Sequence, residues 1–234
     1  MSMPKLITMY GSPWSERVRW AFAFKGLKYE KQNHEPGPAD EEKVKKLTGQ
    51  TLVPVLITDD KVIPDSSAIL EWLEDTRPEP PLLPRSEKDR AQVTLWEELA
   101  IEVLGPQART LINGRLLSSS HPEVQRTAQY FAEKYGHSAF AEEQARLTVK
   151  RLLIALKHTL SGRQYLVGDA FTRADLSIAC MLMLLKPPAD EVFFLSRAER
   201  PVYFEPSADD PAYSAVFAWR DQMYKKHRGE VVKP

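Results

Sequence analysis

Cysteine is almost absent from this sequence of 234 residues, in which Cys180 stands alone. One cysteine cannot form a disulfide within the chain, so a small secreted fold held together by disulfides is excluded. The neighbouring residues 178, 179, 181 and 182 are all apolar, which favours a buried and unreactive thiol. The five histidines are neither paired at helical spacing nor close to this cysteine, so the sequence predicts no metal site.

Net charge and long apolar runs are absent too. The chain has 32 Lys and Arg against 32 Asp and Glu, so no strong field attracts nucleic acid or an anionic membrane. The longest apolar stretch, Ile178–Leu185, falls far short of the roughly 20 residues that span a bilayer. The residues around Lys5 lack the apolar core and cleavage site of a signal peptide. We therefore expect a cytoplasmic protein that binds neither nucleic acid nor a membrane.

The composition that is present belongs to an ordinary globular chain. Hydrophobic residues make up 43% and charged residues 27% of the sequence, and the length allows one or two domains at roughly 100–200 residues each. The prolines between residues 78 and 84 cannot continue a helix. We predict a first domain over residues 1–78, a linker over 79–86 and a second domain over 87–234.

Strands and helices are expected to alternate before the linker. The predicted strands are Lys5–Tyr10, Tyr29–Asn33, Val53–Thr58 and Lys61–Ile63, and the predicted helices are Ser15–Lys25, Ala39–Leu47 and Ser66–Glu74. The first strand–helix–strand unit implies parallel pairing, and the final hairpin adds an antiparallel edge. The first domain is thus predicted to be α/β, with a mixed sheet covered by helices on both faces.

Only helices are expected after the linker. The predicted helices are Glu87–Leu104, Gln107–Leu117, Pro122–Leu160 with a break near residues 135–137, Arg173–Leu185, a short piece at Glu191–Arg197, and Pro211–His227. Gly105 and Pro106 should kink or break the long helix in which they fall. The second domain is therefore predicted to be all-helical.

The first candidate site lies where the first strand turns sharply into the first helix. Ser12 and Ser15 stand at this helix start, where free backbone N–H groups and the positive end of the helix dipole favour an anion. A thiolate would be stabilised there, but the chain has no cysteine in this turn, so the thiol would have to come from a ligand. The alternative is that one serine only caps the helix.

Two further segments have candidate binding groups. Pro54 stands at the head of a strand, where a cis bond after Val53 would turn the Val53 backbone outward to pair with an extended peptide; the alternative is an ordinary edge-strand proline. Asp65 and Ser66 open a helix, so Ser66 can hold a carboxylate while Asp65 accepts from an ammonium group. Here too the alternative is a simple helix cap.

In this order and spacing, the three segments resemble the glutathione-binding half of the cytosolic glutathione transferases. In that family a thioredoxin-like domain has a serine, tyrosine or cysteine at the first helix start, a cis-proline before the third strand, and an acidic residue followed by serine at the next helix start. The run Ser12–Arg19 is most similar to the serine-type classes, tau and zeta among them. The resemblance implies an α/β thioredoxin-like domain followed by an all-α domain, the glutathione transferase fold.

The resemblance also implies that glutathione is the co-substrate. It assigns to Ser12 a hydrogen bond to the glutathione thiolate, with Ser15 as the reserve candidate because the same turn exposes it. The other glutathione contacts that it implies are Trp14, Gln50, Leu52, Val53, Pro54, Asp65 and Ser66.

Two positions depart from the family pattern. Leu52 stands where many relatives have a Lys or Gln that holds the glycine carboxylate of glutathione, so Gln50, Thr51 and Lys45 are the candidates to replace it. Asp65 stands where Glu is usual, which shortens the reach to the γ-glutamyl amine by one methylene.

The second half shows the same resemblance in the segment Phe171–Leu176. Thr172 and Asp175 have the spacing of the family's buried capping box, with Phe171 packing on Leu176 beside it. A capping box starts a helix, so we expect it to act in folding and not in catalysis.

The resemblance implies an enzyme that activates glutathione for conjugation to a small electrophile, as in detoxification, or for reduction of a peroxide. One alternative is a glutathione-dependent isomerase, although the zeta class has a cysteine near the serine where Trp14 stands here. The other is a non-catalytic binding or regulatory protein. The second substrate is expected near Trp14, Gly105, Arg109 and Ile112, and the protein is expected to be a homodimer.

Overall fold

The computed structural model describes residues 2–189, 192–193, 200 and 203–229. It separates into two compact units, Met1–Leu82 and Leu83–Pro234. Among the described residues, no helix has both the length and the apolar character that crossing a membrane requires.

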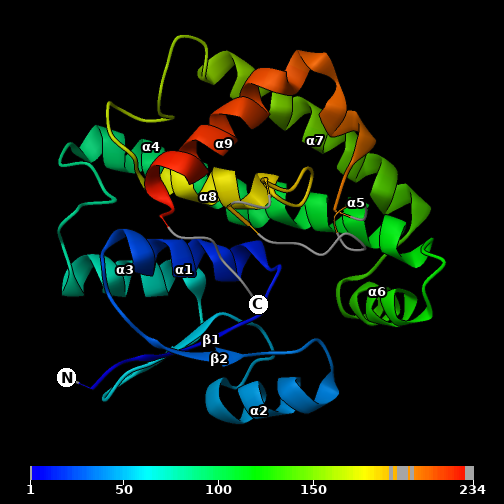
Figure 1. The fold of residues 1–234 in the computed structure, drawn as a ribbon, viewed down its shortest axis with the longest axis horizontal. Helices are drawn as coiled ribbons and strands as arrows, with labels where there is room; N and C mark the ends of the chain where they lie inside the picture. Colours follow the sequence, from blue (N-terminus) through cyan, green and yellow to red (C-terminus); the bar gives the residue numbers. More distant parts are fainter. Residues whose placement is uncertain (1, 190–191, 194–199, 201–202, 230–234) are drawn as a thin grey trace. The chain divides into compact units, whose positions relative to one another are not determined.

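The first unit is a four-stranded mixed sheet with α1 and α3 on one face and α2 on the other (Figure 1). Its elements, in chain order, are β1 Lys5–Thr8, α1 Pro13–Phe24, β2 Glu30–Asn33, α2 Pro38–Thr48, β3 Val55–Ile57, β4 Val62–Ile63 and α3 Ser66–Thr76. The strand order is β2-β1-β3-β4. β1 pairs parallel with β2 and antiparallel with β3, and β3 pairs antiparallel with β4. The predicted order of elements and the predicted mixed sheet are therefore confirmed.

The core of this unit forms around the two central strands. Leu6 and Ile7 of β1 and Val55 and Leu56 of β3 are all at most 1% exposed, and Val44 of α2 packs against Ile7 and Val55. The outer strand β2 has the sequence Glu-Lys-Gln-Asn, which is polar throughout. β2 is an edge strand, and charged side chains on an edge strand hinder pairing with another chain.

The strand-to-helix turn differs slightly from the sequence prediction. β1 ends at Thr8 instead of Tyr10, and α1 begins at Pro13 instead of Ser15. Proline suits the first helical position because its missing N–H would find no partner there in any case. Gly11, at φ 77°, makes the turn between the two elements in a conformation that favours glycine.

The buried Lys25 ties the end of α1 to the end of α3. Its Nζ contacts a carboxylate oxygen of Glu74 at 2.8 Å and donates to the carbonyls of Arg77 at 2.7 Å and Pro80 at 3.0 Å. One cation therefore satisfies the carbonyl of Arg77, the C-cap residue of α3, and holds the proline-rich segment that follows it.

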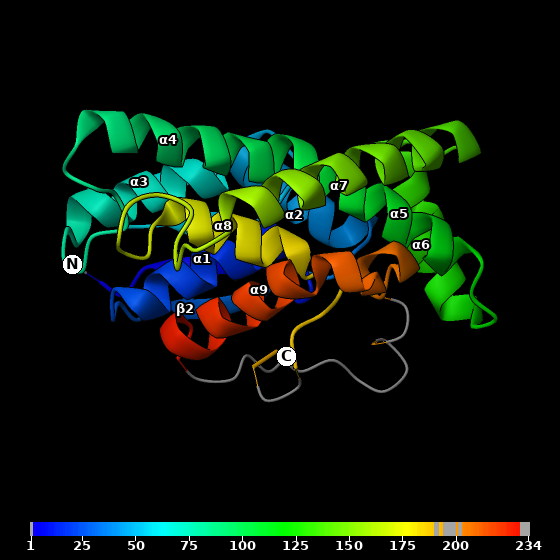
Figure 2. The same cartoon turned by 90° about the horizontal axis from the view of Figure 1, so that it is seen from above.

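The second unit is helical throughout its assigned elements (Figure 2). These are α4 Glu87–Glu98, η1 Leu99–Leu104, α5 Gly105–Leu117, α6 Pro122–Tyr135, α7 Ala139–Thr159, α8 Arg173–Leu182, η2 Pro206–Asp209, η3 Pro211–Tyr213 and α9 Ser214–His227. All ten residues of α8 are buried. α8 packs against α4, η1, α5 and α9, so it forms the centre of the unit.

Of the kink or break predicted at Gly105 and Pro106, the break is wrong. Both residues lie in helix α5, and the six residues before them form the π-helical turn η1. The N–H of Gly105 reaches back to the carbonyl of Ala100, one residue farther than in an α-helix. This wider turn relieves the clash that a proline ring otherwise makes with the preceding turn, so the chain stays helical through the proline.

Other helix boundaries shift by a few residues. The predicted break near residues 135–137 is confirmed, with Gly136 at φ 74° between α6 and α7. α8 ends at Leu182 instead of Leu185, and α9 begins at Ser214 because residues 211–213 form a 3-10 turn. Most of the short helix predicted at Glu191–Arg197 lies outside the described residues.

The capping box at the start of α8 is confirmed. Asp175 Oδ2 accepts from the N–H and the hydroxyl of Thr172, both at 2.9 Å, and Asp175 Oδ1 accepts from the N–H of Leu166 at 2.8 Å. Phe171 stacks on the ring of His227 at 4.3 Å between centroids. Burial raises the pKa of Asp175 to about 6, although its hydrogen bonds oppose that shift.

We predict that Asp175 makes stability depend on pH between about 4 and 6. Its pKa is higher in the folded chain than its ordinary value of 3.8, so folding favours the protonated form. The stability from this proton is fully present below the unfolded pKa and is lost as the pH rises through about 6. Relative to Asp175→Asn, the unfolding free energy in urea should fall across this range and then level off. A difference that stays constant with pH would contradict this prediction.

Candidate active site

Ser12 caps the N-terminus of α1. Its Oγ accepts from the backbone N–H of Ser15 at 3.4 Å, and its own N–H donates to the carbonyl of Met9 at 3.3 Å. The residue is 6% exposed. Because the hydroxyl oxygen acts as the acceptor in this cap, the hydroxyl proton can be donated to an anion at the positive end of the helix dipole. Capping and anion binding are therefore compatible at Ser12.

Ser15 is placed differently. It is fully buried, and its Oγ accepts from the backbone N–H of Met9 at 3.1 Å. This contact joins the first turn of α1 to the residue that follows β1, so it holds the turn in shape. Of the two candidate serines, Ser12 keeps the greater exposure. Trp14, between them, is half-buried.

The segment before β3 has the backbone form that the resemblance implies. The bond between Val53 and Pro54 is cis. The antiparallel pairing of β3 with β1 begins at Val55, two residues after Val53. Leu52 is 48% exposed. Val53 therefore lies outside the strand pairing, and Leu52 next to it has no charge to offer a carboxylate.

Asp65 and Ser66 start α3, as predicted. Asp65 is exposed and caps the helix, its Oδ1 accepting from the N–H of Ala68 at 2.9 Å. Ser66 is the first helical residue and is 4% exposed. The predicted roles, Asp65 accepting from an ammonium group and Ser66 donating to a carboxylate, are compatible with this cap. The cap uses only Oδ1 of Asp65, and Ser66 has a hydroxyl proton to donate.

Arg17 is a site residue that sequence reasoning missed. It lies in α1, is fully buried, and donates from Nη1 to Ser66 Oγ at 2.7 Å and from Nη2 to Ser67 Oγ at 3.2 Å. The sequence contains it only as one charge in the run Arg17-Val18-Arg19. Since α1 is buried on nearly every side, no amphipathic stripe indicates which charged side chain points toward α3.

Gln50 connects the two loops that contain the other predicted contacts. Its Nε2 donates to the carbonyls of Leu52 at 3.1 Å and Pro64 at 3.2 Å, and its Oε1 accepts from the N–H of Leu52. The side-chain amide thus uses both N–H groups and its oxygen on the backbone. It positions the segment before Val53 and the segment before Asp65; direct binding of a carboxylate stays a prediction.

The candidates for a second substrate lie in the second unit, apart from Trp14. Gly105 and Ile112 are buried within that unit. The Arg109 guanidinium lies 3.6 Å from the centroid of the Tyr135 ring, and burial lowers its pKa. The helical unit therefore offers a cation and an aromatic ring at this place, and their use by a substrate stays a prediction.

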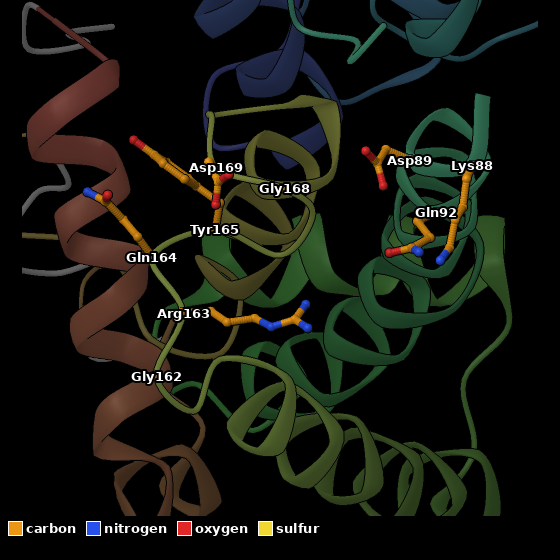
Figure 3. A pocket seen from close by; sticks show the side chains of 9 residues that line it. All are labelled: Lys88, Asp89, Gln92, Gly162, Arg163, Gln164, Tyr165, Gly168 and Asp169. Carbon is orange, nitrogen blue, oxygen red and sulfur yellow. The ribbon is translucent and has the colours of Figure 1, made fainter. Parts of the chain in front are cut away.

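A cavity of about 450 Å³ also opens in the second unit (Figure 3). It lies between α4 and the loop before α8, and its lining residues are Lys88, Asp89, Gln92, Gly162, Arg163, Gln164, Tyr165, Gly168 and Asp169. Figure 3 shows Arg163 extending from the loop toward α4 while the side chain of Tyr165 points away. None of the residues predicted from the sequence lines this cavity. In the part of the chain that the structure describes, no three His, Cys, Asp or Glu side chains are grouped so as to hold a metal ion.

Comparison with known proteins points to one family. Residues 6–81 match the family model "Glutathione S-transferase, N-terminal domain" and residues 126–225 match "Glutathione S-transferase, C-terminal domain". The chain is similar to a maleylacetoacetate isomerase of Dictyostelium discoideum, 31% identical over 180 residues that cover 74% of this chain and 75% of that protein. It is also similar to a protein of Nicotiana tabacum named "Probable glutathione S-transferase", 27% identical over 177 residues, 76% of this chain and 69% of that protein.

Solved structures show the same fold. A glutathione S-transferase from Xanthobacter autotrophicus superposes with a TM-score of 0.69 at 20% identity, covering 99% of this chain and 97% of that one. At this level of identity the likeness concerns the fold, a small mixed sheet followed by helices.

We predict that Gln50→Ala loosens the loops around Val53 and Asp65. Three hydrogen bonds of a half-buried amide are lost, each contributing about 1 kcal/mol at most in such surroundings, so the unfolding free energy should fall by about 1–2 kcal/mol. Urea unfolding followed by circular dichroism measures this change. Gln50→Glu is the matched control, because it keeps the length but sets a carboxylate against two carbonyls and should be at least as destabilising. Unfolding of Gln50→Ala at the native urea midpoint would contradict the bridging role.

Proposed function

This chain belongs to the glutathione S-transferase family, and we propose that it is an enzyme that activates the glutathione thiol for conjugation to a small electrophilic molecule. The observation that carries the proposal is Ser12, which stands at the N-terminus of α1 with its hydroxyl oxygen in the cap and its proton left to donate. Glutathione supplies the nucleophilic sulfur of the reaction.

At the thiol end, the proposed role of Ser12 is to favour the thiolate. Its hydroxyl donates to the sulfur, and the N-terminus of a helix of 12 residues adds a positive potential. Together these lower the pKa of a bound thiol, so that more of it is ionised near neutral pH. The fully buried Ser15 supports this turn through its bond with Met9.

At the γ-glutamyl end, the groups fit an amino-acid head group. Ser66 offers its hydroxyl and the first N–H of α3 to a carboxylate, and Asp65 offers a carboxylate to the ammonium group. Val53, outside the strand pairing, offers its backbone to the cysteinyl part in the manner of an added strand.

At the glycine end the fit is poorer. Leu52 is apolar, and Gln50 uses its amide on the backbone of Leu52 and Pro64. Thr51 is half-buried and Lys45 is exposed on α2. We propose that Lys45 or Thr51 contacts the glycine carboxylate. We expect weaker binding there than a Lys or Gln at position 52 would give.

A second candidate function is glutathione-dependent isomerisation. The relative from Dictyostelium discoideum that is 31% identical is named a maleylacetoacetate isomerase. The same thiolate would serve such a reaction, since it adds to a double bond and leaves again after rotation. Peroxide reduction and a purely regulatory role are the remaining alternatives.

Retention on immobilised glutathione, followed by assays with a chromogenic electrophile, a peroxide and a cis-configured diacid, tests these alternatives. We expect retention and turnover of the electrophile. Retention without turnover of any substrate would favour a binding protein. If the protein is not retained and does not turn over any substrate, the proposal is wrong.

The sharpest prediction concerns Ser12→Ala. A hydrogen bond to a charged group contributes about 1.5–3 kcal/mol, so the variant should raise the pKa of bound glutathione by roughly one to two units. Turnover near pH 7 should fall, while binding stays nearly intact because the head group is held elsewhere. Titration of the thiolate absorbance of bound glutathione measures the shift, and the loss of activity should shrink as the pH rises.

Ser15→Ala is the matched control for Ser12→Ala. It removes a buried acceptor from the N–H of Met9 and should lower stability with little effect on the thiol pKa. The choice of serine is wrong if Ser15→Ala shifts the titration and Ser12→Ala does not. If neither shifts it, the helix dipole and backbone act alone.

We also propose that the protein is a homodimer in the cytoplasm. Phe140, Leu147 and Ile154 follow one another at seven-residue intervals on α7 and are 74%, 41% and 39% exposed. Residues seven apart share one face of a helix, so these side chains form an apolar stripe that pairing with a second copy would cover. The lone Cys180 is buried and forms no disulfide, which suits a reducing compartment.

Light scattering should give twice the chain mass of 26.7 kDa at micromolar concentration. The double substitution F140E and L147E should shift the protein toward the monomer, because charges on the stripe oppose its burial. Leu47→Glu is the control, since Leu47 is similarly exposed, at 49%, but lies on α2. A native protein that is monomeric at this concentration would refute the dimer.

A further inference from the structure

The cavity of the second unit has an unusual lining for a ligand site. Its volume of about 450 Å³ lies within the range of small-molecule pockets. Such pockets are lined mainly by apolar side chains, whereas this one is lined by charged side chains, amides, a tyrosine and glycines. The charged residues are two cations, Lys88 and Arg163, and two carboxylates, Asp89 and Asp169. A ligand of this cavity should therefore be polar and charged.

One side of the cavity is a face of helix α4. Lys88 and Gln92 are four residues apart, and Asp89 and Gln92 are three apart, so all three side chains lie on one face of the helix. Asp89 belongs to the first turn of α4, where the helix dipole favours the ionised carboxylate. The helix therefore fixes one cation, one carboxylate and one amide at the cavity.

The other side is a loop that is held firmly to the helices behind it. The carbonyl of Gln164 accepts from Trp219 Nε1 at 2.9 Å, and the hydroxyl of Tyr165 accepts from Lys226 Nζ at 2.7 Å. The N–H of Leu166 donates to the capping box of α8 at 2.8 Å. Three consecutive residues are thus bonded to α8 and α9. Binding at this loop does not have to order it first, which favours affinity.

The charges at the cavity are separated by sign. In Figure 3 the carboxylates of Asp89 and Asp169 lie toward one end, and the guanidinium of Arg163 and the amino group of Lys88 lie toward the other. A simple anion would use only the cationic end, and a simple cation would use only the acidic end. A ligand with a positive group at one end and a negative group at the other is complementary to both ends.

We propose that this cavity binds a short peptide of two or three residues with free ends. Such a peptide has an ammonium group and a carboxylate at opposite ends, separated by about 3.5 Å for each residue of extended chain. The ammonium group lies at Asp89 and Asp169, and the carboxylate lies at Arg163 and Lys88. The amide of Gln92 offers a donor and an acceptor to the peptide backbone. The site lies within the second unit and does not depend on the proposed function.

Triglycine is the probe, because it has both charged ends and no side chains. Its binding is followed by the backbone amide NMR signals of Gly162 and Gly168, two of the 10 glycines of the chain. We expect these signals to shift until they saturate. N-acetyl-triglycine lacks the ammonium group and triglycine amide lacks the carboxylate. Each should bind about three- to fivefold more weakly, since exposed ion pairs contribute little apiece.

Two variants test the two ends separately. Arg163→Gln should weaken triglycine binding about three- to fivefold and leave the binding of triglycine amide unchanged, because that analogue has no carboxylate for Arg163. Asp89→Asn should weaken triglycine binding similarly and leave N-acetyl-triglycine unchanged. Arg163 is exposed and Asp89 is half-buried, so neither change disturbs the core. Arg151→Gln is the control, because Arg151 is exposed on α7 and does not line the cavity.

Glutathione provides a further comparison. Its γ-linkage leaves a carboxylate beside the ammonium group, which Asp89 and Asp169 would repel, so it should shift the two glycine signals less than triglycine does. Saturable shifts with the losses described for each end support the peptide site. The proposal is overturned if triglycine at millimolar concentration shifts neither signal, or if the two analogues or glutathione bind there as tightly. Retention of Arg163→Gln on immobilised glutathione shows in either case whether the proposed function stands.

Discussion

One buried guanidinium connects the two helix starts of the first unit. Arg17 leaves α1 little more than one turn after its cap and reaches both hydroxyls in the first turn of α3. A buried arginine needs such partners, because an unpaired charge inside a protein is strongly unfavourable. The contact therefore constrains where the N-terminus of α3 lies relative to α1. The groups that we propose to activate the thiol and to bind the head group are thus placed by the same pair of helices.

The loops next to α1 and α3 are held by uncharged side chains, those of Gln50 and Ser15. Gln50 uses its amide on the backbone of Leu52 and Pro64, and Ser15 uses its hydroxyl on the N–H of Met9. Each of these side chains satisfies backbone groups that have no strand or helix partner, which is how a short loop keeps one shape. The Gln50 amide, one of the groups expected to replace a Lys or Gln at position 52, is therefore already in use. In the proposed mode of binding, the first unit therefore offers more polar groups to the thiol and γ-glutamyl ends of glutathione than to its glycine end.

The second unit is organised by a different buried group. Asp175 joins the start of α8 to the loop before it by accepting from Thr172 and Leu166. Nearby, the buried pair of Glu97 and Arg173, with 2.8 Å between nitrogen and oxygen, joins α4 to the first residue of α8. Both contacts fix the helix that is buried along its whole length, so the unit is built around α8. The geometry of the predicted capping box is therefore confirmed, and its role in folding stays a prediction.

The sequence by itself determined the order of elements, the mixed character of the sheet and the starts of several helices. Ser12 before Pro13, and Thr172 with Asp175, are local signals, since a cap acts within one turn of the chain.

The tertiary structure alone decided that Arg17 meets Ser66, 49 residues away, and that Gln50 meets Pro64, 14 residues away. It also decided that residues 99–106 stay helical, where the proline suggested a break. Such contacts depend on how helices and loops pack in space, and a helix buried on nearly every side has no hydrophobic period that would indicate them.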